Sequence, residues 1–111
     1  MYIKEAILPR QKYFAELCDE HHVRKLYAFG SSLTDAFDNA ESDIDLMVEI
    51  NEHDPIKKGG LLLDFYTSME HFFDRKVDML TDQPLKNPYL KKEVDNTKML
   101  IYDGERKKVL I

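Results

Sequence analysis

Two kinds of hydrophobic periodicity alternate along the chain. In residues 10–21 the apolar positions recur at helical spacing, which predicts an amphipathic helix with Pro9 in its first turn. The same spacing in residues 61–73 predicts a second, longer helix, and the polar stretch 51–60 before it predicts a loop. The pattern therefore predicts two long amphipathic helices.

Short apolar segments between these helices predict strands at residues 24–29, 43–50, 75–80 and 98–102. The second strand alternates strictly, so that one face carries Ile44, Leu46, Val48 and Ile50 and the other carries Asp43, Asp45, Met47 and Glu49. Asn87 followed by Pro88 is typical of a helix start and predicts a short helix that runs to about Asp95. With one more short helix after Gly30, helices and strands alternate, which predicts an α/β or α+β domain around one sheet.

Length and composition favour a single domain over residues 1–111. The 111 residues are 43% hydrophobic and 33% charged, which suffices for one core. A net charge of −5 with dispersed basic residues argues against direct nucleic-acid binding through the phosphate backbone. The chain has no apolar run of membrane-spanning length, no signal-peptide pattern, and a single cysteine, Cys18. We therefore expect a cytoplasmic protein that does not bind membranes.

The candidate chemistry begins where the first predicted strand ends, at Gly30, Ser31 and Ser32. A sharp turn into a short helix exposes backbone N–H groups there, which favours binding of an anion such as phosphate. On its own this pattern is weak, because Gly-Ser turns are common in proteins without any ligand.

A carboxylate pair follows in the next strand. Asp43 and Asp45 share one face, with side chains roughly 6–7 Å apart, so both can reach one cation or a pair of cations. Mg²⁺ accepts such oxygen ligands and completes its shell with water and phosphates, and Mn²⁺ accepts the same ligands. Asp78 faces away from its two apolar neighbours and joins the pair if the two strands are adjacent. A phosphate turn followed by these carboxylates predicts a nucleotide site.

Each carboxylate also has a simpler structural interpretation. An Asp-x-Asp at a strand start commonly caps a turn or lies at a solvated edge. Asp78 can instead pair with Arg75 or Lys76 in water, a contact of little energetic value. The combination favours a functional site over a purely structural role, because carboxylates clustered beside a buried strand face repel one another and are not stabilised there unless a ligand binds them.

Gly30-Ser31, Asp43-x-Asp45 and Asp78 together resemble the signature of the polymerase-beta-like nucleotidyltransferase superfamily. The resemblance is to its minimal form, the stand-alone proteins encoded beside HEPN-domain partners in bacteria and archaea. It covers nearly the whole chain, including the runs at 42–46, 75–78 and 87–102. It implies a mixed sheet of four to five strands flanked by helices.

The resemblance also implies an activity, the Mg²⁺-dependent transfer of a nucleoside monophosphate, AMP from ATP or another NTP, to a hydroxyl. In that scheme Gly30 permits the turn, and Ser31 and Ser32 with adjacent N–H groups hold the outgoing phosphates. Two cations clamp the displacement, with Asp43 and Asp45 as metal ligands and Asp78 beside the acceptor hydroxyl as ligand or general base. The implied acceptor is a tyrosine of a HEPN toxin, which makes this chain an antitoxin.

Two features depart from the family pattern. Eleven residues, 32–42, separate Ser31 from Asp43, about one more than in the minimal family, which predicts an insertion in the loop at 37–41. The segment after Ser31 also lacks the arginine with which many members neutralise triphosphate charge. Lys57 and Lys58 are candidates to replace that arginine.

These departures keep an alternative open, a protein of the same fold that neutralises a partner toxin by binding alone. A third hypothesis, nucleotidylation of a small molecule such as an aminoglycoside, is disfavoured because that class uses a second domain to hold the acceptor. In every case a partner must complete so small a site. We expect a hetero-oligomer that forms through the exposed sheet face or the helix at 61–73.

Overall fold

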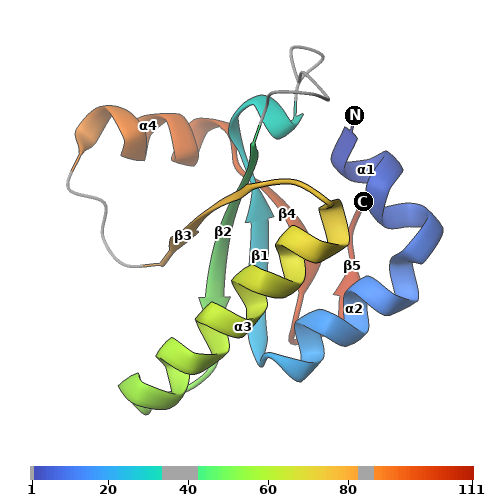
Figure 1. Ribbon diagram of the computed structural model, residues 1–111. Helices are drawn as coiled ribbons and strands as arrows, with labels where there is room; N and C mark the ends of the chain where they lie inside the picture. The colour runs from blue at the N-terminus through green and yellow to red at the C-terminus, as the bar shows by residue number, and fades with distance from the viewer. Residues whose placement is uncertain (1, 34–42, 83–86) are drawn as a thin grey trace.

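The computed structural model describes residues 2–33, 43–82 and 87–111, which form a five-stranded mixed sheet in the order β3-β2-β1-β4-β5 (Figure 1). The strands are β1 (Val23–Ala28), β2 (Ile44–Ile50), β3 (Val77–Thr81), β4 (Met99–Asp103) and β5 (Lys108–Val109). The helices are α1 (Tyr2–Ile7), α2 (Gln11–Glu20), α3 (Pro55–Phe73) and α4 (Pro88–Thr97), with 3-10 helices η1 (Leu8–Arg10) and η2 (Gly30–Leu33). β2 and β3 are parallel, and the other neighbouring strands are antiparallel. The α/β fold class and the mixed sheet are therefore confirmed.

Most predicted elements are present with ends shifted by one to three residues, but the loop predicted at 51–60 is wrong in its second half. Helix α3 already begins at Pro55. The Asp54 side chain caps it by accepting hydrogen bonds from two first-turn N–H groups, at 2.9 and 3.3 Å. Asn87 caps α4 in the same way, at 2.9 and 3.3 Å. Capping signals, rather than hydrophobic periodicity, therefore define both helix starts.

Three short elements lie outside the predictions or differ from them. The sequence pattern does not predict α1 or β5, and Pro9 lies in η1, directly before α2 rather than within it. The insertion expected in the loop at 37–41 falls outside the described residues. No helix in the described ranges is long and apolar enough to cross a membrane.

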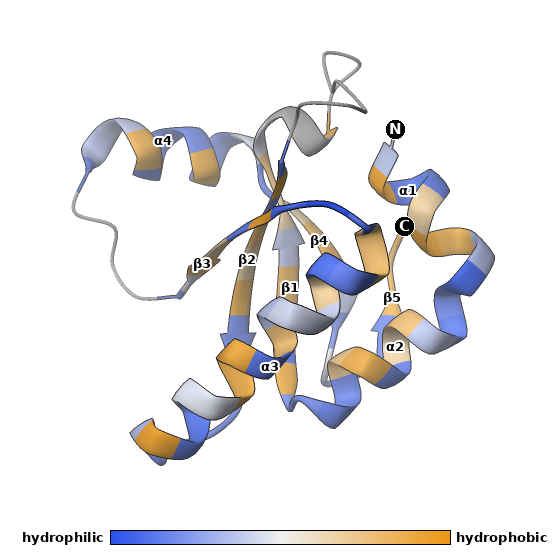
Figure 2. Cartoon of the chain, in the orientation of Figure 1, coloured by the Kyte–Doolittle hydropathy of each residue, from blue (hydrophilic) through white to orange (hydrophobic). Residues whose placement is uncertain are grey.

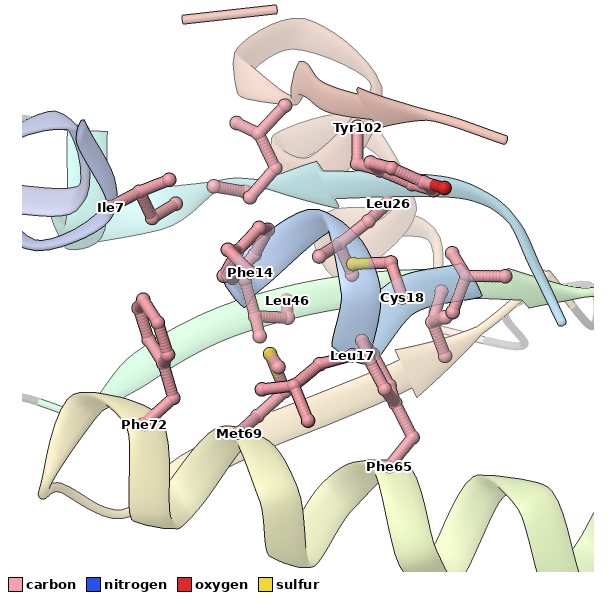
Figure 3. Packing of buried hydrophobic residues seen from close by; sticks show 14 of the residues in the cluster. Ile7, Phe14, Leu17, Cys18, Leu26, Leu46, Phe65, Met69, Phe72 and Tyr102 are labelled. Atoms are coloured by element: carbon pink, nitrogen blue, oxygen red, sulfur yellow. The ribbon is translucent and has the colours of Figure 1, made fainter. Parts of the chain in front are cut away.

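Helices α2 and α3 pack on one face of the sheet and form the core with it (Figures 1 and 3). Figure 3 shows side chains of both helices and of the sheet packed together, among them Phe14, Leu17 and Cys18 of α2, Phe65, Met69 and Phe72 of α3, and Leu26 and Leu46 of the sheet. The rings of Phe14 and Phe72 meet edge to face at 5.0 Å. Because the core takes one face, the residues that alternate with it point to the other.

The alternation of β2 is as predicted (Figure 2). Ile44, Leu46 and Val48 are fully buried, whereas Asp45 between them is half-buried on the opposite face. Helices α1 and α4 both contact η2, at the end of the sheet where β1 ends and β2 begins. This end carries the predicted site.

Candidate active site

The chain turns directly after β1, at Gly30. The N–H of Phe29 donates to the carbonyl oxygen of Asp45 at 3.1 Å, which holds the turn against β2. Gly30 has φ +66°, in the left-handed region that favours glycine. A Cβ at this position would lie 2.5 Å from Oδ2 of Asp45, closer than real Cβ contacts allow. The glycine therefore lets the turn approach the carboxylate side chain.

The predicted short helix after Gly30 is present as the 3-10 helix η2, which contains Ser31 and Ser32. Their backbone therefore follows the turn directly and lies beside β2. Their role in binding nucleotide phosphates stays a prediction.

The three predicted carboxylates come together because β2 and β3 are neighbours. The parallel register places Asp45 opposite Asp78 and Ile44 opposite Val77. Adjacent strands are about 4.8 Å apart, so Asp45 and Asp78 project side by side from the face that α2 and α3 leave uncovered. Asp43, two residues before Asp45, extends this row and is exposed, as Asp78 is.

Electrostatics mark this row as a concentration of negative charge. The pKa of the Asp45 carboxyl is raised from 3.8 to about 6, first by burial and then by the nearby negative charges of Asp78, Asp43 and Glu93 in that order. Sequence analysis missed Glu93, which α4 brings near the row. No local signal identifies it, because a glutamate on a polar helix is usually a solvated residue.

The donor chemistry of Asp43, Asp45 and Asp78 suits Mg²⁺ or Mn²⁺. Within residues 2–33, 43–82 and 87–111, no group of three or more His, Cys, Asp or Glu side chains is arranged to hold a metal ion. Mg²⁺ usually takes only one or two protein carboxylates and fills the rest of its shell with water and substrate phosphates. The charges of Asp78, Asp43 and Glu93, which add to burial in raising the pKa of Asp45, are negative charges that a cation would offset. The carboxylates therefore fit a cation in kind, and metal binding stays a prediction.

The suggestion that Lys57 and Lys58 replace the missing arginine is not supported. Nζ of Lys58 lies 3.9 Å from Oδ1 of Asp82, which follows the carboxyl end of β3. Asp78 is near the amino end of that strand, and four residues of extended chain span about 13 Å. The two lysines therefore lie at the other end of the sheet from the turn at Gly30.

A hollow of about 540 Å³ also lies at that other end, between the start of β1 and the β4–β5 turn. Three of its charged side chains, Asp19, Arg24 and Lys107, already have partners. Lys107 pairs with Asp19 at 3.5 Å, and Arg24 donates to Asn51 at 3.0 Å. The hollow is distant from the carboxylate row, so we do not assign the nucleotide to it.

Comparison with known proteins shows which family the chain belongs to. Residues 12–107 match the family model described as "Polymerase beta, Nucleotidyltransferase". Two proteins of Methanocaldococcus jannaschii are similar over 100 residues, which cover 90% of this chain and 93% of each relative. "Putative protein adenylyltransferase MJ1379" is 33% identical and "Putative protein adenylyltransferase MJ0126" is 29% identical.

Two solved structures share the fold. A crystal structure of a mutant of the toxin-antitoxin MntA-HpeT has a TM-score of 0.58 at 16% identity, and the match covers 88% of this chain and 80% of that one. A crystal structure of a toxin-antitoxin with AMP-PNP has a TM-score of 0.58 at 19% identity, over 87% of this chain and 76% of that one. At these identities the structural match shows the fold alone, whereas the family model spans most of the sequence. The chain with this carboxylate row belongs to the polymerase beta nucleotidyltransferase family and is itself a nucleotidyltransferase.

Proposed function

We propose that the protein transfers a nucleoside monophosphate, in the first place AMP from ATP, to a hydroxyl of a partner protein. The observation that carries the proposal is the row of Asp43, Asp45 and Asp78 directly beside the Gly30 turn. A protein acceptor is supported by the M. jannaschii relatives, whose names both contain the words "Putative protein adenylyltransferase". An adenine nucleotide is supported by the structure of similar fold that contains AMP-PNP.

In the proposed reaction the backbone N–H groups of Gly30, Ser31 and Ser32 bind the outgoing phosphates. Asp43, Asp45 and Asp78 are the residues that would hold Mg²⁺ or Mn²⁺. Bound there, two such cations would offset the charge of the attacking and leaving oxygens.

The group transfer itself is an in-line displacement at the α-phosphorus. The acceptor oxygen bonds to that phosphorus, and the bond from it to the oxygen bridging the α- and β-phosphates breaks, so that pyrophosphate leaves. Asp78 is exposed beside Asp45, and as the proposed general base its carboxylate takes the hydroxyl proton and passes it to water.

The proposed acceptor is a toxin of the HEPN type, which the sequence resemblance implies, and the chain is then its antitoxin. The two toxin-antitoxin structures of similar fold support this context. The carboxylate row lies on the sheet face that α2 and α3 do not cover, so an acceptor has open access to Asp78.

Binding without catalysis is the second candidate function. It is favoured by one observation, that Gly30–Leu33 contains no arginine and that Lys57 and Lys58 lie at the far end of the sheet. Both candidates predict a complex with the toxin, and they differ in what the carboxylates do there.

The experiment measures label transfer from ATP labelled at the α-phosphate, with Mg²⁺, into the protein encoded by the neighbouring gene. The test variant carries Asp43→Asn with Asp45→Asn, and Asp64→Asn on the exposed side of α3 is the matched control. Label in the partner that the double variant loses and the control keeps supports the enzyme. A double variant that still neutralises the toxin as well as the wild type refutes it in favour of binding alone.

A further inference from the structure

Arg75 and Lys76 are adjacent in sequence but serve different parts of the fold. Arg75 Nε donates to the hydroxyl of Tyr2 at 3.2 Å, and its guanidinium lies 5.2 Å from the centre of that ring. Tyr2 in turn donates to the carbonyl oxygen of Phe73 at 3.4 Å, so these contacts fasten α1 to the end of α3. Arg75 is therefore a structural residue, whereas Lys76 is a basic residue next to the carboxylate row.

The backbone of Lys76 already belongs to the sheet. Its carbonyl oxygen accepts a hydrogen bond from the N–H of Ile44 at 3.0 Å. Val77, the next residue, is buried with 5% of its surface exposed. Because side chains alternate along an extended chain, Lys76 and Asp78 share the face that α2 and α3 leave uncovered.

The register between β2 and β3 then shows which residue of the neighbouring strand lies beside Lys76. Ile44 is opposite Val77 and Asp45 is opposite Asp78, so one step earlier Asp43 is level with Lys76. Neighbouring strands are about 4.8 Å apart and residues two apart on one strand are roughly 6–7 Å apart. Lys76 is thus one corner of a small array whose other corners are three carboxylates, and its flexible four-carbon stem can bring the ammonium over any of them.

The ammonium of Lys76 is open to a ligand. Lys76 is exposed, and none of the ion pairs formed by the described part of the chain includes it. The charges of Asp78, Asp43 and Glu93, all negative, raise the pKa of Asp45. Because the strand register sets Lys76 beside this row, an anionic ligand that brings cations to the row would meet Lys76 as a further positive charge.

The side of approach follows from the order of the strands. The Gly30 turn lies on the β1 side of Asp45, and Lys76 lies on the β3 side. We propose that Lys76 contacts a non-bridging oxygen of the α-phosphoryl group from the acceptor side, opposite the turn that holds the outgoing phosphates. This assignment rests on the proposed nucleotidyl transfer, and it supplies a positive charge that the segment after Ser31 lacks.

The test compares Lys76→Ala and Lys76→Arg with Lys57→Ala, an exposed lysine at the far end of the sheet. Two quantities are measured with Mg²⁺ present. One is the dissociation constant of α,β-methylene-ATP by calorimetry, because carbon replaces the bridging oxygen and transfer cannot occur. The other is kcat/KM for transfer of AMP to the partner. Thermal unfolding of each variant checks the fold, and an exposed lysine should leave the Tm unchanged.

For Lys76→Ala we expect binding of the analogue to weaken by roughly three- to tenfold and kcat/KM to fall by about tenfold or more, as for one lost charge-assisted hydrogen bond. Lys76→Arg should keep most of the affinity for the analogue and most of kcat/KM. Lys57→Ala should match the wild type in both quantities. The proposal is overturned if Lys76→Ala binds and transfers within about twofold of the wild type, or if Lys57→Ala loses as much.

The same measurements separate this inference from the function on which it rests. If the wild type transfers AMP and the Lys76→Ala variant binds the analogue and transfers AMP equally well, only the role of Lys76 is refuted. A wild type that binds the analogue through Lys76 but transfers nothing refutes the transferase proposal and leaves the phosphate contact standing. A wild type that does neither refutes both.

Discussion

Asp45→Asn should stabilise the protein in the absence of divalent cations. The Asp45 carboxyl has its pKa raised from 3.8 to about 6, first by burial and then by the neighbouring carboxylates. The folded protein therefore holds this proton more tightly than the unfolded chain does. Ionisation of Asp45 costs folding free energy, and asparagine removes that cost while keeping nearly the same shape.

The size of the effect follows from the pKa shift. A shift of about 2 units corresponds to an upper limit of about 3 kcal/mol, and solvent screening of this half-buried group reduces it to about 1–2 kcal/mol. The stability that the raised pKa confers is fully present below pH 3.8 and is lost as the pH rises through about 6. The advantage of the variant should therefore be near zero at pH 4 and complete near pH 7.5, where it raises the Tm by about 4–8 °C.

The assay is urea unfolding followed by circular dichroism at pH 4.5, 6 and 7.5 in the presence of a chelator, with Asp64→Asn as the control for an exposed carboxylate. Adding Mg²⁺ at pH 7.5 should stabilise the wild type more than the Asp45→Asn variant, because ligand binding to the folded state adds to its stability. An advantage of the variant that is the same at all three pH values refutes the electrostatic reasoning. So does a variant that is less stable than the wild type at pH 7.5.

The remaining predictions concern single side chains. Gly30→Ala should lose at least about 1 kcal/mol, because a Cβ meets the Asp45 carboxylate and the left-handed backbone is strained, and it should no longer bind nucleotide; unchanged urea unfolding and calorimetry would contradict this. Tyr102→Phe should gain about 1 kcal/mol in urea unfolding, since the buried Tyr102 hydroxyl has no hydrogen-bond partner in the described part of the chain; a loss of stability would show that it has one. Burial raises the pKa of the Cys18 thiol, so iodoacetamide at pH 8 should label it only in urea, and rapid labelling of the native protein argues against its place in the core. Asp54→Ala should cost about 1 kcal/mol through the lost cap of α3, with circular dichroism showing fraying, and a neutral result would mean that α3 does not depend on this cap.

The strict alternation of β2 was sufficient to predict which side chains form the core and which form the site. Ile44 and Leu46 face α2 and α3, and Asp45 faces away, because successive side chains of a strand point to opposite faces. The same alternation correctly separated Val77 from Asp78 in β3. Local sequence therefore predicts the facing of each carboxylate.

Which residues of different strands lie side by side depends on how the strands pair, and the hydrophobic pattern of the sequence does not predict this pairing. Asp78 reaches Asp45 only because α3 crosses over the sheet and returns the chain parallel to β2, beside it. Glu93 reaches the row because α4 packs against η2. The sequence offered two basic candidates in Lys57 and Lys58, and tertiary structure instead brings Lys76 beside the carboxylates.

One face of the sheet forms the core and the other carries the carboxylate row. This division explains why the protein tolerates the repulsion among these carboxylates. The core lies between the sheet and the helices α2 and α3, and none of its contacts depends on Asp43, Asp45 or Asp78. At the end of β1, by contrast, the repelling carboxylates raise the free energy of the folded protein without its ligands. Cations and phosphates that bind only the folded state would offset this cost in proportion to their concentration over their dissociation constant. If the proposed function holds, the same residues lower the stability of the free protein and raise its affinity for ligands, which is the behaviour expected of a site built for charge neutralisation rather than for folding.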